Sequence, residues 1–192
     1  MITIDVVKER LRSHHAARLE DRSLAHAAVA IVLRDSDIGA EFIVIHRSHR
    51  QGDPWSGHMA LPGGRRQAED RDLLMTVERE TREEVGVNLE REGELLGRLD
   101  DLRAVGRGRL LDLVITPFVY AACGPIALTP DPTEVQSAFW ISLATLRHDE
   151  ARGVYRQRLN DQETEFPAFI YQGHTIWGLT HRILTGFLDV LG

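Results

Sequence analysis

The pattern of one stretch predicts an amphipathic helix directly after a Pro-Gly-Gly turn. This stretch is residues 61–87, LPGGRRQAEDRDLLMTVERETREEVGV. Within residues 70–85, Leu74, Val77, Thr81 and Val85 recur at spacings of three and four, which predicts one core-facing helical stripe. Gly86 is expected to end the helix, because glycine readily adopts the left-handed conformation of a helix C-terminus. A helix with a single apolar stripe buries that stripe against another element, so the stretch predicts a helix packed on a larger core.

Strand-like and helical patterns share the rest of the chain. We expect helices at residues 4–12, from residue 143 and within 175–191, and strands at 26–34, 42–47, 94–101, 110–122 and 137–143. Residues 49–60 are rich in turn formers and predict a loop. Because the elements lack a steady β-α-β rhythm, an α/β fold with a mixed sheet between helical layers fits best. The 192 residues suit one domain, 1–192, in which 1–24 form an N-terminal helical extension.

Composition narrows the function classes. The formal net charge of −6 and the pI near 5.8 make nucleic acid a poor partner. No window approaches the roughly 18 apolar residues of a membrane span, and the N-terminus lacks a signal peptide, so we expect no membrane association and a cytoplasmic location. The single cysteine, Cys123, excludes a disulfide framework, and we expect it to be a buried, inert thiol.

Three glutamates on the helix require a separate explanation. Glu80, Glu83 and Glu84 stand at i, i+3 and i+4, so we expect their carboxylates to converge on one patch opposite the apolar stripe. Like charges at this spacing repel, whereas a hard divalent cation such as Mg²⁺ prefers oxygen ligands. Arg79 is placed to hold a glutamate in position by an ion pair. The alternative interpretation is a salt-bridged surface helix.

The stretch resembles the Nudix box, G-x5-E-x7-R-E-U-x-E-E-x-G-U, with Arg79 to Val87 matching R-E-T-R-E-E-V-G-V. Gly64 precedes Arg79 by fifteen residues instead of fourteen, so Glu69 and Asp70 compete for the first acidic position, and Asp70 fits better by distance from Gly64. The resemblance implies a Nudix-type α/β/α sandwich with a central mixed β-sheet. It also implies a hydrolase of a nucleoside diphosphate linked to another moiety.

The resemblance assigns roles to residues of this chain. Mg²⁺, or Mn²⁺, is expected on Glu80, Glu84, Glu83 and the carbonyl of Gly64. Arg79 is expected to orient a glutamate. The general base is either Glu83 or Glu134, the latter in the segment TPDPTEVQ before a predicted strand. His49 and His58 are not expected to be metal ligands, because nearby carboxylates suit Mg²⁺ better.

The region before the glycines is similar to the coenzyme A pyrophosphatase branch of the family. Residues 43–64 match its upstream motif at Arg47, Ser48, Gly57 and the Pro-Gly-Gly, and IWGLT (176–180) also resembles this branch. One residue is added in the middle, and Gly52 or Asp53 lies where a basic residue is expected, so Arg50 is the replacement cation. The resemblance implies cleavage of coenzyme A or acyl-coenzyme A to 3′,5′-ADP and (acyl-)phosphopantetheine.

Substrate contacts are expected at Arg47, Arg50, Trp55, Gly57 and Gly63. Trp55 either stacks on an adenine or anchors its loop on the core. Another loop carries Arg103, Arg107 and Arg109, which either cover an anionic group such as a 3′-phosphate or form a solvated hairpin. An ADP-sugar, a dinucleotide or NADH is the competing substrate, and a non-catalytic nucleotide-binding module is the competing function. Nudix enzymes are often dimers, so the resemblance also allows a homodimer.

Overall fold

A mixed β-sheet forms the centre of the computed structural model, which describes residues 1–21, 23–49, 55–106, 109–159 and 162–192. Its strands are β1 (Ala25–Ser36), β2 (Gly39–Arg47), β3 (Met59–Ala60), β4 (Gly63–Arg65), β5 (Gly93–Arg98), β6 (Leu102–Gly106), β7 (Arg109–Ala122) and β8 (Val135–Ser142). The central path runs β3-β2-β1-β7-β5, with β4 on β1, β6 on β7 and β8 on β2. Only the β1–β7 pairing is parallel among these described strands, so the sheet is mixed.

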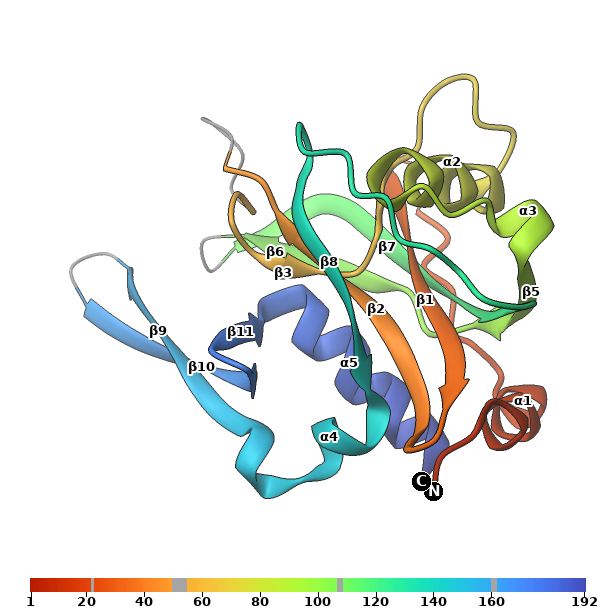
Figure 1. Cartoon of the computed structure of the whole chain (residues 1–192). Coiled ribbons are helices and arrows are strands. Elements are labelled where there is room, and N and C mark those ends of the chain that lie inside the picture. Colours follow the sequence, from red (N-terminus) through yellow and green to blue (C-terminus); the bar gives the residue numbers. More distant parts are fainter. Residues whose placement is uncertain (22, 50–54, 107–108, 160–161) are drawn as a thin grey trace.

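Helices cover both faces of this sheet (Figure 1). They are α1 (Ile4–Ser13), α2 (Leu73–Val85), α3 (Leu89–Glu92), α4 (Leu143–Arg147) and α5 (Gly178–Leu191), with a 3-10 turn at Asp149–Ala151. Strand β1 is buried on both faces: Ile31 and Leu33 join the core beneath α1 and α5, whereas Ala30 and Val32 join the core beneath α2. The α/β/α sandwich predicted from the sequence is therefore confirmed.

Local chemistry sets the ends of α2. The side chain of Asp72 accepts a hydrogen bond from Met75 N at 2.9 Å, which caps the first turn. Gly86 ends the helix in the left-handed conformation, with φ of 76°, as predicted. Val77, Thr81 and Val85 are buried, as the periodicity predicts. The expectation for Glu84 is wrong: its side chain does not lie opposite this stripe but is itself buried.

A second, three-stranded antiparallel sheet was not predicted. It consists of β9 (Arg152–Leu159), β10 (Gln162–Tyr171) and β11 (His174–Trp177), in the order β11-β10-β9. Figure 1 shows the β9–β10 hairpin extending away from the central sheet. Residues 174–177 are therefore a strand, and the last helix begins only at Gly178.

Cys123 also differs from its expectation. Strand β7 ends at Ala122, and Cys123 is exposed in the turn that follows instead of buried in the strand. Its backbone N–H donates to the carbonyl of Glu92, so the turn is held to the end of α3. Residues 102–106 are strand β6, which pairs with β7, so most of the predicted basic loop belongs to a hairpin.

Candidate active site

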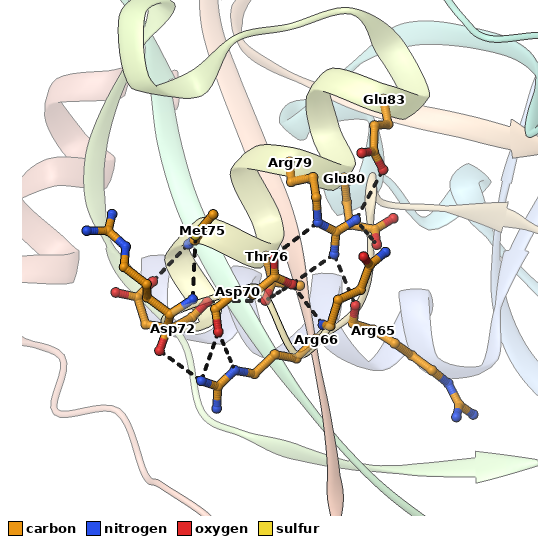
Figure 2. A network of polar contacts seen from close by, with 11 residues as sticks. Arg65, Arg66, Asp70, Asp72, Met75, Thr76, Arg79, Glu80 and Glu83 are labelled. Atoms are coloured by element: carbon orange, nitrogen blue, oxygen red, sulfur yellow. Dashed lines mark hydrogen bonds and ion pairs between the residues drawn. The ribbon is translucent and has the colours of Figure 1, made fainter.

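Arg79 is the centre of a polar network on α2 (Figure 2). Its Nε and Nη2 donate to the two carboxylate oxygens of Asp70 at 3.1 and 2.9 Å, and its Nη1 donates to Glu80 at 2.7 Å and Glu83 at 3.1 Å. Nη2 also donates to the carbonyl of Arg65 at 3.2 Å. The bonds to Asp70 are the main cause that raises the pKa of Arg79. A guanidinium tied to three carboxylates keeps its charge and its position.

Asp70, not Glu69, takes part in this network. The Asp70 side chain is buried, and besides Arg79 it accepts hydrogen bonds from Gln67 N at 2.9 Å and the Thr76 hydroxyl at 3.0 Å. These bonds, with those from Arg79 the largest cause, hold the pKa of Asp70 well below its usual range despite burial. Glu69 is exposed. The Asp70 carboxylate therefore fastens the loop after β4 to the middle of α2.

Glu84 is a buried carboxylate beside the glycine turn. Its Oε2 accepts a hydrogen bond from Gly63 N at 2.8 Å, and its Oε1 lies 3.4 Å from Nη1 of Arg47. Burial raises the pKa of Glu84 to about 8, although the Gly63 N–H and the Arg47 charge both lower it. The neighbouring charges of Glu80 and Glu134 raise this pKa further. The ionised carboxylate is thus only partly compensated by the protein.

Glu80 lies against Gly64. A Cβ placed on Gly64 would come within 2.4 Å of the Glu80 carboxyl carbon, so only glycine leaves room for this side chain. Burial raises the pKa of Glu80, the ion pair with Arg79 lowers it, and the charges of Glu83 and Glu134 raise it again. The half-buried Glu80 and the buried Glu84 therefore each lie against one of the paired glycines.

Glu80, Glu84 and the paired glycines line a pocket of about 770 Å³. The predicted site residues that line it are Arg47, Trp55, Gly63, Gly64, Glu80, Glu84 and Glu134. Trp55 also packs against the larger core, which agrees with the second of its two expected roles, the loop anchor. The structure thus gathers residues from β2, β4, α2 and the segment before β8 around one cavity.

Other predicted residues lie outside this wall. Glu83 and Gly57 are not among the lining residues. The Glu83 side chain is 52% exposed and pairs with Arg79. Arg103 binds the Leu111 carbonyl and Asp112, so it faces β7. Arg50 and Arg107 lie outside the described residues.

The oxygen donors of the pocket suit a divalent cation. Burial and mutual repulsion raise the pKa values of Glu80 and Glu84, which is the situation that a bound cation relieves. Across the described ranges of the chain, however, no three His, Cys, Asp or Glu side chains gather into a ready-made metal cluster. The carboxylates are instead held by Arg79, Arg47 and the Gly63 N–H. The donor set fits a cation that also takes water and substrate oxygens.

Sequence reasoning missed the other end of the pocket. The walls there come from the β6–β7 hairpin, from β9, β10 and β11, and from the start of α5. They are Val105, Leu113, Gln157, Phe166, Trp177, Gly178, Leu179, Thr180, Arg182 and Ile183. The alternation in residues 152–159 and 162–171 was a signal for these strands, but polar side chains occur on both faces, with arginines and glutamates on one and glutamines on the other, and mask it. Trp177, interpreted as part of a helix, lies at the end of β11.

Fold and site together define a pyrophosphohydrolase, with buried and half-buried carboxylates beside a glycine turn on an α/β/α sandwich. The chain belongs to the Nudix family, because the NUDIX domain matches residues 24–161. Hydrolases of this family generally use divalent metal ions.

Similar proteins agree with this assignment. The chain is 31% identical over 189 residues to the human mitochondrial coenzyme A diphosphatase NUDT8, across 95% of this chain and 75% of that protein. It is 41% identical over 106 residues to the uncharacterized protein C14C4.10c of Schizosaccharomyces pombe, across 54% of this chain and 32% of that protein. This chain therefore matches about a third of the fission yeast protein's length. The assignment to the coenzyme A pyrophosphatase-like branch rests on the first of these relatives.

Solved structures share the fold. A MutT/nudix family protein from Enterococcus faecalis matches with a TM-score of 0.55 and 19% identity, across 94% of this chain and 66% of that one. The Ap4A hydrolase of C. elegans, in a binary complex, matches with a TM-score of 0.52 and 19% identity, across 63% of this chain and 82% of that one. Among the described helices, none combines the length and hydropathy that a membrane span requires.

Proposed function

We propose that the protein is a Mg²⁺-dependent hydrolase that cleaves the diphosphate of coenzyme A or acyl-coenzyme A to 3′,5′-ADP and (acyl-)phosphopantetheine. The observation that carries the proposal is the carboxylate wall formed by Glu80, Glu84 and Glu134 beside Gly63 and Gly64. The choice of substrate is supported by the 31% identity to the human coenzyme A diphosphatase over nearly the whole chain.

Glu80, Glu84 and the carbonyl of Gly64 would hold Mg²⁺, with Glu83 as a further predicted ligand. When bound, the ion neutralises charge on the diphosphate and makes a water molecule more acidic. Arg79 keeps Glu80 in position through their 2.7 Å ion pair. Arg47, at the same wall, would pair with a phosphate oxygen.

The chemical step needs a base for the attacking water. Glu134 lines the pocket and its charge acts on Glu80 and Glu84, so we place it first; Glu83 is the second candidate. The carboxylate takes one proton from the water as the water oxygen bonds to one phosphorus and the bridging P–O bond breaks. The released phosphate oxygen keeps the electron pair of that bond.

Product analysis tests the proposal. Purified protein is incubated with Mg²⁺ or Mn²⁺ and coenzyme A, acyl-coenzyme A, ADP-ribose, NADH or diadenosine polyphosphates, beside a Glu84→Gln control. We expect 3′,5′-ADP and phosphopantetheine from coenzyme A, lost in the control. Cleavage of a different compound keeps the hydrolase but rejects the coenzyme A substrate. Binding without cleavage of any compound supports a nucleotide-binding module instead.

The assembly and location of the protein remain predictions. We propose that residues 1–192 act as one domain, with 1–24 as its helical extension, and that the chain forms a homodimer, which sedimentation analysis of the purified protein tests. We also retain the predicted cytoplasmic location, although the human and mouse relatives are named as mitochondrial. Fractionation of cells that express the protein separates the two locations.

A further inference from the structure

The end of the pocket away from the family motif is lined by residues of the second sheet and of α5. The NUDIX domain match stops at residue 161, yet Phe166, Trp177 and the first turns of α5 all line the same cavity as Glu80 and Glu84. The carboxylate end is thus set by the family motif, whereas the far end combines Val105, Leu113 and Gln157 of the matched span with residues that follow it.

One face of the second sheet is aromatic. The register pairs Tyr155 with Phe166 and Ala168 with Trp177, so these side chains share a face, together with Gln157 two residues along β9. The opposite face is charged at Arg156, which forms ion pairs with Glu165 at 2.8 Å and Glu163 at 3.6 Å, whereas Phe169 further along this face is buried in the larger core. The aromatic face therefore carries the pocket residues Phe166 and Trp177, whereas the exposed ion pairs of Arg156 lie on the other face.

The aromatic face is preorganised. Trp177 stacks on Tyr155 with ring centroids 4.0 Å apart and an interplanar angle of 22°, and it also contacts Phe166 at 5.5 Å and His58 at 4.9 Å. Tyr155 is not among the lining residues and lies behind Trp177, whereas Trp177, Phe166 and His58 all line the cavity. Rings held in this way lose little freedom when a flat ligand packs on them.

Gln157 supplies the polar group of this end. It is half-buried and lines the pocket beside Phe166, and within the described residues its amide has no hydrogen bond to the protein. A side-chain amide offers one acceptor and two donors, and a glutamine pairs with the adjacent N6 and N7 of adenine through two hydrogen bonds. An aliphatic ligand would leave this amide unpaired. The aliphatic wall at Leu113, Ile115 and Ile183 suits such a ligand better.

From this arrangement we propose that Gln157, Phe166 and Trp177 form a nucleobase subsite with a preference for adenine, and that Gln157 determines that preference. The proposal rests on the proposed function in one respect, namely that the substrate contains a nucleotide. The nucleotide half of the substrate would bind at the second sheet, and the other half of the substrate would bind at the aliphatic wall.

Binding measured without catalysis tests the subsite. The full chain in EDTA is titrated calorimetrically with AMP, GMP, CMP and UMP, using wild type, Gln157→Leu, Phe166→Ala and the control Gln136→Leu. Gln136 is an exposed glutamine on β8 that does not line the pocket. Thermal unfolding of each variant establishes that it is folded.

We expect wild type and Gln136→Leu to bind AMP about tenfold more tightly than GMP, and Gln157→Leu to lose that preference. Phe166→Ala is expected to weaken binding of all four nucleotides about fivefold, because it removes a stacking surface. A folded Gln157→Leu variant that retains the preference, or a wild type that binds none of the four at millimolar concentration, overturns the subsite.

The hydrolysis assay separates this result from the proposed function. If wild type prefers AMP through Gln157 but cleaves no diphosphate, the subsite stands and the hydrolase fails. If coenzyme A is cleaved but Gln157→Leu leaves its KM unchanged, the hydrolase stands and the subsite fails. A Phe166→Ala effect that depends on acyl chain length and not on the base also overturns the subsite, because the aromatic end would then hold the acyl arm.

Discussion

At the scale of single residues, the two base candidates have different surroundings. Glu134 lines the pocket, whereas Glu83 does not line it and pairs with Arg79. We therefore expect Glu134→Gln to lower kcat by about 10²- to 10⁴-fold, the contribution of a general base, with little change in the folded state. Glu83→Gln should lower kcat less than about tenfold. Steady-state kinetics at saturating Mg²⁺ measure kcat of both variants. A larger loss of kcat in Glu83→Gln than in Glu134→Gln would make Glu83 the base.

Asp70 is a second case at this scale, with Glu69 as its natural control. Asp70→Asn removes a buried carboxylate bound to Arg79, so we expect the free energy of unfolding at pH 7 to fall by about 1–3 kcal/mol. The exposed Glu69→Gln should change it by less than about 0.5 kcal/mol. Urea titrations measure both values. Equal effects would mean that the Arg79 network does not depend on Asp70.

The pH dependence of this difference follows from the direction of the pKa shift. Because the folded-state pKa of Asp70 is depressed, its stabilisation is complete above the unfolded-state value, about 4, and is lost as the pH falls toward the lower folded-state pKa. The gap between wild type and Asp70→Asn should therefore be largest at neutral pH and shrink below about pH 4. A gap that widens on acidification would contradict the assigned ion pair.

At the scale of elements, β4 and α2 meet at Gly64 and Glu80. Gly64→Ala would place a methyl group 2.4 Å from the Glu80 carboxylate, which is the mobile end of a side chain, so the carboxylate moves and the fold survives. We expect kcat/KM to drop about tenfold or more, while the free energy of unfolding changes by less than about 1 kcal/mol. Gly186→Ala, at an exposed and open position of α5, is the control and should stabilise by about 0.5–1 kcal/mol with normal kinetics. Full activity in Gly64→Ala would show that catalysis does not require the Glu80 carboxylate to lie against residue 64.

The same scale shows how far the sequence predicts the structure. Helix α2 and its end at Gly86 follow from spacing, because apolar periodicity and glycine conformation are local properties. The burial of Glu84 does not follow from spacing, because it depends on the N–H of Gly63, which lies 21 residues earlier in the chain. Strands β9 and β10 were missed because polar side chains on both faces interrupt the apolar pattern. Carboxylates could be named as site residues from the sequence, but their orientations could not.

At the scale of the whole molecule, the pocket is shared between distant parts of the chain. The acidic residues of its wall are Glu80, Glu84 and Glu134, whereas its far wall combines Val105 and Leu113 with residues between 157 and 183. Local patterns cannot predict a cavity whose two walls meet only through tertiary packing. The assignment to the family was nevertheless possible, because the motif that defines it is contiguous from Gly64 to Val87.

The N-terminal segment raises the last question at this scale, namely whether α1 is only an extension. Val7 and Leu11 are buried in the larger core cluster, and the backbone N–H groups of Ala17 and Leu19 donate to Asp100 and Asp101. Leu11→Ala should therefore lower the free energy of unfolding by about 2–5 kcal/mol, as for other buried leucines, and leave kcat unchanged because α1 does not line the pocket.

Leu19→Ala is the matched control, because Leu19 is 41% exposed and the variant keeps the backbone bond to Asp101. We expect it to change stability by less than about 0.5 kcal/mol. Urea unfolding followed by tryptophan fluorescence compares the two variants. A Leu11→Ala protein as stable as Leu19→Ala would show that α1 is dispensable for the core, whereas a large difference would place α1 inside the folding unit that carries the active site.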